Sequence, residues 1–409
     1  MANNNENKIL NVPHLRFPEF SGEWEKYRLC DVASIVGRIG FRGYTTNDIV
    51  TKGKGAIALS PTNIENNKLT YDKDNTYISF YKYEESPEIM IKQGDVIFVK
   101  TGSTVGKVAY VDKLICKTTL NPQVVVLKDI QCDNYLLSVL MSTNKFQNAI
   151  RKIIVGGAVP TLSQAAMGDI VVTMPQATEQ EKLSKFISLL DDRIATQNKI
   201  IEKLQSLIKG IVDELMTVLL KGELYPFASL YIKAGEGGTP TTSVSKYYSG
   251  GSIPFIKIDD LSQKYLTSNK DFITELGMQK SSAWLIPSQS VIYSNGATIG
   301  AISINKYPVC TKQGILGIVP NINVNVEYLY LLMSSSYFSK EVGRIITEGT
   351  MKTAYLKDIN HIKSPLPSKA QQQNITNLTS SIEKKLSMEQ NCLKFLKLQK
   401  QHLLRTMFI

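Results

Sequence analysis

The sequence has little of what metal sites, redox centres and acid–base catalysis require. Of its 409 residues only three are histidines and five are cysteines. The cysteines, at positions 30, 116, 132, 310 and 392, form no CxxC pair, which argues against a zinc site and a disulfide framework. No apolar run approaches the roughly 20 residues that span a membrane, and the N-terminus has no apolar signal core. We therefore expect a cytoplasmic protein with reduced thiols and no metal.

Catalytic motifs are scarce as well. The best candidate is residues 102–107 (GSTVGK), which follow a strand-like run and resemble a phosphate-binding loop. The motif is one residue short, and Val108 stands where a Ser or Thr would reach Mg²⁺. We find no dinucleotide fingerprint, no metal-ligand spacing and no carboxylate pair that recurs in the chain. A recognition protein is favoured over an enzyme, with a cryptic enzyme as an alternative.

Length and charge indicate several domains and a polyanionic ligand. A chain of 409 residues is too long for one compact core and predicts two or three domains. The net charge is +11. Residues 27–176 hold 17 basic and 13 acidic side chains, and residues 220–368 hold 14 and 10, so each region carries +4. Matching positive charge is typical of polyanion binding, although a merely basic soluble protein would look the same.

A long helix is predicted over residues 178–220, and its design returns 192 residues later. Its heptad positions are Leu183, Ile187, Leu190, Ile194, Gln197, Ile201, Leu204, Ile208, Ile211 and Leu215. Adding 192 to each gives Ile375, Thr379, Ile382, Leu386, Glu389, Leu393, Leu396, Lys400, Leu403 and Met407. Apolar residues that alternate at spacings of four and three are typical of a coiled coil. Matching phase and matching central polar positions favour one paired seam over two unrelated amphipathic helices.

The globular regions repeat too, so the chain contains an internal duplication. Residues 96–106 (VIFVKTGSTVG) return as residues 290–300 (SVIYSNGATIG), residues 140–142 (LMS) return as 332–334, and Gly157 returns as Gly349. In the first region we expect strands at 56–59, 95–99 and 123–127 and one helix over 134–153. Capping boxes at Thr178/Glu181 and Ser368/Gln371 should open the long helices.

These observations predict an α+β fold with two globular domains separated by a long antiparallel coiled coil. The expected parts are an N-terminal arm (1–26), a first domain (27–176), a central helical spacer (177–222), a second domain (223–368) and a C-terminal helical spacer (369–409). Because domain termini usually lie close together, the second helix should run back beside the first. Ile409 would then return to the first domain near the arm. A pseudo-two-fold axis would cross the seam near Gln197 and Glu389.

Two loops have a composition suited to DNA. Residues 38–46 (RIGFRGYTT) and 237–248 (GGTPTTSVSKYY) mix cations, hydroxyls and aromatics, which suits phosphate and base-edge contacts, although ordinary turns share it. We predict DNA contacts by loop residues of both domains: Arg38, Arg42, Tyr44, Thr45, Lys100, Thr101, Ser103, Lys107, Thr161, Thr239, Thr241, Lys246, Tyr247, Lys257, Ser294, Asn295, Thr298, Lys352 and Tyr355.

The whole chain resembles the specificity subunit of type I restriction–modification systems. The resemblance is carried by the opening VPHLRFPEFSGEWEKYRL, by GRIGFRGYTTND and GKGAIALSPTNI, and by helical regions beginning PQATEQEKLSKFISLLDDRI and PSKAQQQNITNLTSSIEKKL.

The resemblance implies that each globular domain is a target-recognition domain reading one half of a bipartite, asymmetric double-stranded DNA site. It implies that the helices are a spacer that docks two modification (methyltransferase) subunits, with restriction subunits joining them. S-adenosylmethionine, ATP and Mg²⁺ would belong to those partners, and this chain would bear no catalytic residue. A coiled-coil scaffold without DNA specificity is the alternative.

Overall fold

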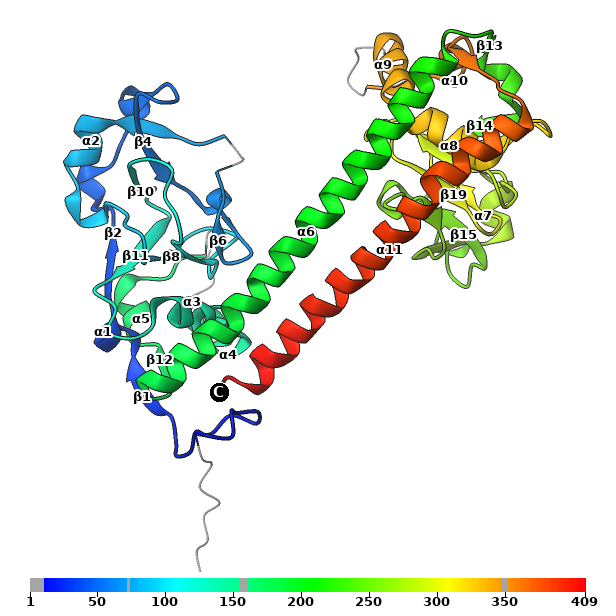
Figure 1. The fold of residues 1–409 in the computed structure, drawn as a ribbon. Coiled ribbons are helices and arrows are strands. Elements are labelled where there is room, and N and C mark those ends of the chain that lie inside the picture. The colour runs from blue at the N-terminus through cyan, green and yellow to red at the C-terminus, as the bar shows by residue number, and fades with distance from the viewer. Residues whose placement is uncertain (1–10, 72–73, 155–159, 347–351) are drawn as a thin grey trace, which may run out of the picture. The chain divides into compact units, whose positions relative to one another are not determined.

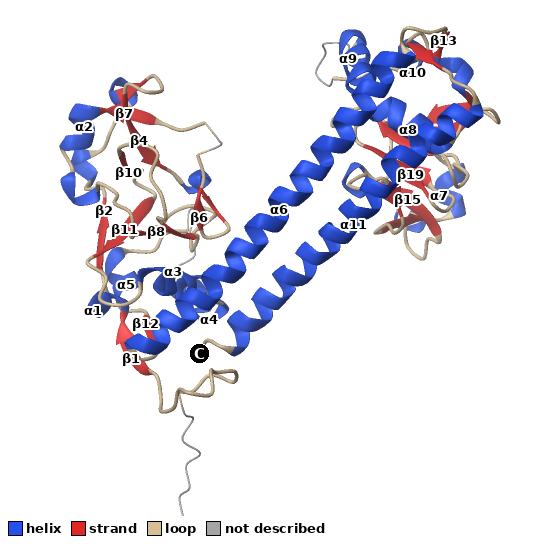
Figure 2. Cartoon of the chain, in the orientation of Figure 1, coloured by secondary structure: helices blue, strands red, loops and turns tan. Residues whose placement is uncertain are grey.

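The computed structural model describes residues 11–71, 74–154, 160–346 and 352–409. The chain divides into two compact units (Figures 1 and 2). The first unit holds Met1–Thr196 with Leu393–Ile409, and the second holds Gln197–Cys392. In the described parts of the chain, no helix is both long and apolar enough to cross a membrane.

The first unit is built on a six-stranded sheet of order β2-β11-β8-β9-β6-β5, beside a four-stranded sheet β10-β4-β7-β3 and a β1-β12 pair. Its strands are β1 (Glu25–Arg28), β2 (Ser34–Gly37), β3 (Ile49–Val50), β4 (Gly55–Leu59), β5 (Ile64–Glu65), β6 (Lys68–Leu69), β7 (Tyr77–Ser79), β8 (Val96–Val99), β9 (Val108–Tyr110), β10 (Thr118–Leu120), β11 (Val124–Lys128) and β12 (Val171–Met174). Every side chain of β4 and β8 is buried, which explains their continuous apolar sequences. The three predicted strands are confirmed within a residue.

Short helices cover the first unit's sheet. They are α1 (Leu29–Val32), η1 (Gly40–Arg42), η2 (Thr46–Asp48), η3 (Pro61–Asn63), α2 (Phe80–Glu84), η4 (Pro87–Ile89), α3 (Asn134–Ser142), α4 (Asn144–Ile153) and α5 (Gln164–Gly168). The prediction of one helix over 134–153 was wrong. Thr143 adopts an extended backbone (φ −66°, ψ 153°), which ends α3 and begins α4. Its hydroxyl donates to the Leu140 carbonyl at 2.7 Å, an interaction typical of a residue that competes with helical hydrogen bonding.

The second unit repeats the order of the first. Its five-stranded sheet is β14-β21-β18-β19-β16, beside β17-β15-β20 and a β13-β22 pair. The strands are β13 (Leu224–Pro226), β14 (Tyr231–Glu236), β15 (Ile253–Ile256), β16 (Tyr265–Leu266), β17 (Asp271–Ile273), β18 (Val291–Ser294), β19 (Ile302–Asn305), β20 (Cys310–Thr311), β21 (Ile315–Pro320) and β22 (Lys363–Pro365). The helices are η5 (Phe227–Leu230), η6 (Ser245–Tyr247), η7 (Ile258–Asp260), α7 (Glu275–Gln279), α8 (Val326–Ser334), α9 (Ser336–Ile345) and α10 (Leu356–Ile359).

Equivalent hydrogen bonds recur at the predicted spacing. In the first unit Gln180 Oε1 accepts from the Asp133 amide at 3.0 Å, and in the second Gln372 Oε1 accepts from the Asn325 amide at 2.7 Å. Both pairs lie 192 residues apart, as do the starts of α3 and α8. The recurrence of Gly157 as Gly349 falls outside the described residues.

The long helices are α6 (Ala177–Leu219) and α11 (Lys369–Thr406). Thr178 lies inside the first turn of α6 and is not its N-cap, so that predicted capping box was misplaced. The box at Ser368 and Gln371 is confirmed, because each residue's side chain accepts from the other's amide. Every predicted seam residue is buried or half-buried, including the polar Gln197.

The chain end packs into the first unit, as predicted. The Leu15 amide donates to the Thr406 carbonyl at 2.9 Å, and the rings of Trp24 and Phe408 meet edge to face. Arg16 makes a buried ion pair with Glu179 at the start of α6. Trp24, Met407 and Phe408 share one apolar core with α3 and α6, so the residues that follow α11 help to complete this unit.

Candidate nucleic-acid interface

Three loop segments converge in the first unit on the connection between β10 and β11. We call residues 38–46, 100–106, 119–123 and 160–162 the first loop cluster. Arg38 Nε donates to the Leu120 carbonyl at 2.9 Å, and its Nη2 donates to Thr119 Oγ1 at 3.1 Å. The Tyr44 ring lies 5.4 Å from the guanidinium, and Asn121 donates to its hydroxyl at 3.4 Å. The loop after β2 is thereby anchored on the β10–β11 connection.

The hairpin between β8 and β9 joins the same connection through backbone hydrogen bonds. The Lys100 amide donates to the Gln123 carbonyl at 2.9 Å, and the Lys100 carbonyl accepts from the Leu162 amide at 2.8 Å. Thr101 and Thr161 form an antiparallel bridge. Residues 60 positions apart in the sequence therefore present neighbouring side chains.

The second unit builds an equivalent second loop cluster from residues 236–240, 295–300, 312–315 and 353–354. The Asn295 amide donates to the Gly314 carbonyl at 3.0 Å, and its carbonyl accepts from the Ala354 amide at 2.9 Å. The Gln313 amide donates to Thr239 Oγ1 at 3.4 Å. By these hydrogen bonds, Asn295 of the second unit corresponds to Lys100 of the first. The sequence repeat instead aligns Lys100 with Ser294, one residue earlier.

Glycine recurs in both hairpins because the backbone requires it. Gly106 has φ +98° and Gly300 has φ +99°, a region that side-chain-bearing residues rarely adopt. Gly102, at φ +102°, shares this property. The resemblance to a phosphate-binding loop is thus explained by turn geometry.

The predicted DNA contacts fall into three groups. Exposed or half-buried residues of the clusters and their immediate flanks are Arg42, Tyr44, Thr45, Lys100, Thr101, Ser103, Thr161, Thr239, Thr241, Thr298, Lys352 and Tyr355. Buried residues are Arg38, Ser294 and Asn295. Lys107 directly follows the first cluster, but its ammonium group donates to the Ile64 carbonyl. Lys246, Tyr247 and Lys257 lie outside the segments that form the second cluster.

The buried residues support the loops from beneath. Arg38 is 6% exposed, and burial lowers its pKa while raising the pKa of Tyr44. Asn295 is 1% exposed, and its Nδ2 donates to the Ala354 carbonyl at 3.1 Å. The Arg38 guanidinium and Asn295 Nδ2 donate to backbone carbonyls and so position neighbouring loops. Asn295 Oδ1 and Ser294 Oγ are buried without a hydrogen-bond partner among the described residues.

The displaced residues have local partners elsewhere. Lys107 Nζ donates to the Ile64 carbonyl at 3.3 Å, and Lys257 pairs with Asp271 at 2.9 Å. Lys246 lies exposed in η6, where its carbonyl accepts from Thr274. The side chains of Lys107 and Lys257 are therefore engaged by neighbouring protein groups outside the loop clusters.

Sequence reasoning missed the residues at the centre of each cluster. Asn121 and Gln123 occupy the β10–β11 connection, and Lys312 and Gln313 occupy the β20–β21 connection. Gln123, Lys312 and Gln313 are exposed. The available signal was a short polar turn, Asn-Pro-Gln or Lys-Gln-Gly, between two apolar strands.

Comparison with known proteins gives the family. The model for the type I restriction modification DNA specificity domain matches residues 21–206 and again residues 232–397. The MjaIX type I restriction enzyme specificity subunit of Methanocaldococcus jannaschii is 31% identical over 147 residues, covering 35% of this chain and 34% of that protein. The HindI type I restriction enzyme specificity subunit of Haemophilus influenzae is 22% identical, with 80% of this chain and 86% of that protein covered.

A solved structure shares the fold. The type I restriction–modification system S subunit from M. genitalium matches with a TM-score of 0.55 and 14% identity, covering 97% of this chain and 99% of that one. With one specificity domain matched in each half, the chain belongs to the DNA specificity family of type I restriction–modification systems.

Proposed function

We propose that the two domains read two different halves of one asymmetric double-stranded DNA target. The observation that carries the proposal is the pair of equivalently built loop clusters. Each cluster is held by the same backbone bonds, Lys100 to Gln123 in the first and Asn295 to Gly314 in the second. A shared scaffold with different side chains would place equivalent loops in the DNA grooves and recognise different base pairs.

The side chains that the clusters present differ, which favours an asymmetric target. The first offers Arg42, Tyr44 and Gln123, whereas the second offers Thr239 and the exposed Lys312. Arginine and glutamine can each bind a purine edge through two hydrogen bonds, while lysine more often provides a point charge. The half-sites would therefore differ in sequence.

We further propose that α6 and α11 form an antiparallel coiled coil with pseudo-two-fold symmetry that sets the spacing of the half-sites. Within the second unit, Gln197 Nε2 donates to the Glu389 carbonyl at 3.1 Å and also contacts its carboxylate. Within the first unit, Lys400 pairs with Asp191. The 43 residues of α6 span about 65 Å, roughly two turns of DNA at ~34 Å each.

The outer faces of these helices would dock two modification (methyltransferase) subunits. Large apolar side chains remain exposed there: Leu189, Ile200, Leu207, Val218, Leu378, Met388, Phe395 and Leu398. Apolar patches on a soluble protein typically mark interaction surfaces. Restriction subunits would join the complex in the cytoplasm, and S-adenosylmethionine, ATP and Mg²⁺ would bind to the partners, leaving this chain non-catalytic.

Replacing a cation in one loop cluster should relax recognition of one half-site. Arg42→Ala and Lys312→Ala are each expected to cost about 1–3 kcal/mol of binding free energy if the side chain reaches a base. A contact to phosphate alone would weaken binding on all sequences with a shallower salt dependence. The measurement is the affinity of the complete complex for duplexes altered in one half-site or the other.

Lys369→Ala, at the start of α11, removes the same charge outside both clusters and is the control. Lys246→Ala, also outside them, should have a smaller effect than Lys312→Ala. Unchanged affinity in both cluster variants would contradict the assignment of these loops. Absence of any duplex binding at low salt would favour a coiled-coil scaffold.

A further inference from the structure

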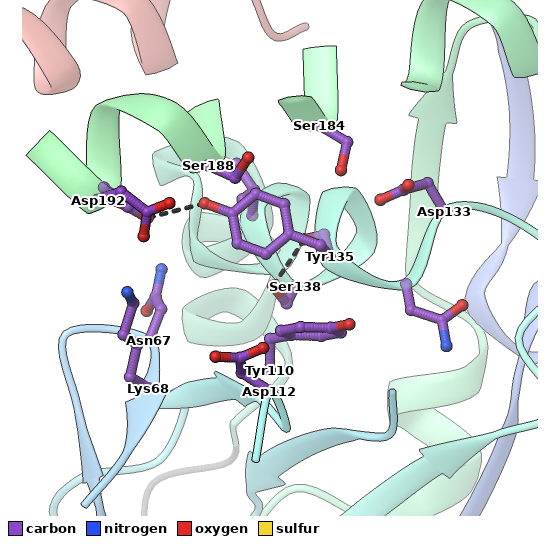
Figure 3. Close-up of a pocket in the computed structure, with 13 residues that line it drawn as sticks. Asn67, Lys68, Tyr110, Asp112, Asp133, Tyr135, Ser138, Ser184, Ser188 and Asp192 are labelled. Carbon is purple, nitrogen blue, oxygen red and sulfur yellow. Dashed lines mark hydrogen bonds between the residues drawn. The ribbon is translucent and has the colours of Figure 1, made fainter. Parts of the chain in front are cut away.

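An acidic cavity of about 550 Å³ lies in the first unit, away from the loop cluster (Figure 3). Its lining residues come from the start of β6 and the turn before it, from the end of β9 and Asp112 beyond it, from α3 and from α6. Asp112, Asp133, Asp191 and Asp192 contribute carboxylates, against the single lining cation Lys68. In Figure 3 the side chain of Tyr135 crosses the cavity toward α6.

Two of these carboxylates already have strong partners. Asp133 Oδ1 caps α3 by accepting from the Leu136 amide, and Asp191 accepts from the Tyr135 hydroxyl at 2.8 Å and pairs with Lys400. Asp112 and Asp192 have no cationic partner within the described chain. Burial, and then the neighbouring carboxylates, raise the pKa of Tyr135 above its usual range. The cavity thus carries uncompensated negative charge.

Because the chain is duplicated, the second unit has a site equivalent to this cavity. The Tyr110 amide donates to the Asn67 carbonyl at 3.2 Å, and the Ile304 amide donates to the Lys264 carbonyl at 2.7 Å. Lys264 therefore stands where Asn67 stands. At the 192-residue spacing of the helices, Glu327 replaces Tyr135 and Glu383 replaces Asp191.

In the second unit, a lysine fills the equivalent place. Lys264 Nζ lies 2.6 Å from a carboxylate oxygen of Glu327 and 2.6 Å from one of Glu383. The Tyr265 hydroxyl donates to Glu327 at 2.7 Å, and its ring lies 5.4 Å from the same ammonium group. An ammonium group between two half-buried carboxylates and an aromatic face is a built cation site.

The second unit also carries positive residues where the first has its unpaired carboxylates. Tyr110 and Ile304 are equivalent strand residues, so Asp112 and Lys306, each two residues further on, correspond to one another. On the long helices, Asp192 corresponds to Lys384 at the 192-residue spacing. In the second unit, the carboxylates at the equivalent site are therefore neutralised by lysines of the chain itself. The first unit keeps acidic residues on α6 and the cavity, but has Asn67 in place of Lys264. Its Asp191 is paired with Lys400 instead, which leaves the carboxylates of Asp112 and Asp192 without a lysine partner among the described residues.

We propose that the cavity of the first unit receives a lysine or arginine side chain from the modification subunit that docks on α6. The inference rests on the docking proposed above. Leu189, which is 60% exposed, lies one turn from Asp192 on α6, so the cavity adjoins the proposed docking face. DNA is not the occupant, because clustered carboxylates repel phosphate.

The test measures binding of the purified modification subunit to the full-length chain. Asp112→Lys/Asp192→Lys installs the residues of the second unit and should weaken this binding at least tenfold at low salt. The control, Asp74→Lys/Asp169→Lys, makes the same change of charge at exposed sites outside the cavity and should change binding less than twofold. Asp112→Asn/Asp192→Asn, which preserves side-chain shape, should give an intermediate loss and replaces the lysine variant if that variant fails to fold.

The outcomes separate this inference from the docking on which it depends. If the unaltered chain does not bind the modification subunit, the docking proposal fails and the cavity proposal fails with it. If the unaltered chain binds and the cavity variants bind equally well, only the cavity proposal is overturned. An equal loss in cavity and control variants would indicate general electrostatic attraction and would also overturn it.

Discussion

Ile201→Asp is expected to destabilise the second unit by about 3 kcal/mol or more, because it places an unpaired carboxylate at a buried, apolar position of the helix. Ile201 is 8% exposed and lies one turn after Gln197, whose polar group is satisfied by Glu389. The next seam residue on the same helix, Leu204, is apolar and offers an aspartate at position 201 no hydrogen bond. Denaturant unfolding of the purified chain measures the loss, and assembly with the modification subunit should disappear with it.

Leu207→Asp provides the matched control for this prediction. Leu207 lies on the same helix and is 50% exposed, so its replacement should change stability by less than about 0.5 kcal/mol. Because Leu207 belongs to the proposed docking face, this variant should fold normally yet bind the modification subunit more weakly. Leu393→Asp, at a half-buried seam position, should be intermediate. A stable Ile201→Asp variant that still assembles would contradict the coiled-coil proposal.

A fragment of residues 1–220 is expected to dimerise and, with the modification subunit, to modify an interrupted palindrome. The fragment retains the first loop cluster and all of α6, whose seam would be exposed in a monomer. An exposed row of apolar side chains favours aggregation unless another surface buries it. The simplest such arrangement is an isologous dimer, in which the α6 helices of two fragments pack against each other. Two identical domains would then read two copies of the first half-site.

The structure shows what the partner copy must replace. In the full chain, Leu403 of α11 and the two residues that follow the helix end, Met407 and Phe408, complete the core of the first unit. The residues of α6 that lie 192 positions earlier are Ile211, Leu215 and Met216, which are apolar and of similar size.

One interaction would not be reproduced in the dimer. Lys400 corresponds to Ile208, so Asp191 would lose its ion pair and retain the Tyr135 hydroxyl. Breaking a largely buried pair is costly, and Ile208→Lys should therefore strengthen the fragment dimer. Sedimentation gives the oligomeric state, and mapping of methylated bases gives the target. A folded monomer, or modification of an asymmetric site only, would contradict the prediction.

The loop clusters show where sequence reasoning met its limit. Arg38 and Arg42 lie four residues apart in one loop, and the sequence predicts the same DNA-contacting role for both. Arg38 is nevertheless buried and donates to the Leu120 carbonyl, while Arg42 is half-exposed beside Glu88. Nothing local separates them. The difference arises because the end of β10, about 80 residues away, accepts hydrogen bonds from the Arg38 guanidinium, whereas the Arg42 guanidinium pairs with Glu88.

The two long helices, the duplication and the family could be predicted from the sequence by itself. Heptad periodicity and repeated segments are visible in the order of residues and do not depend on which distant segments come into contact. Only the tertiary structure decided which loop residues meet, why Lys264 is enclosed by Glu327 and Glu383, and why the corresponding place near Asn67 is open. Those outcomes depend on contacts between segments distant in the chain. A side chain's exposure and charge environment are set by such contacts, and residue type and spacing alone do not specify them.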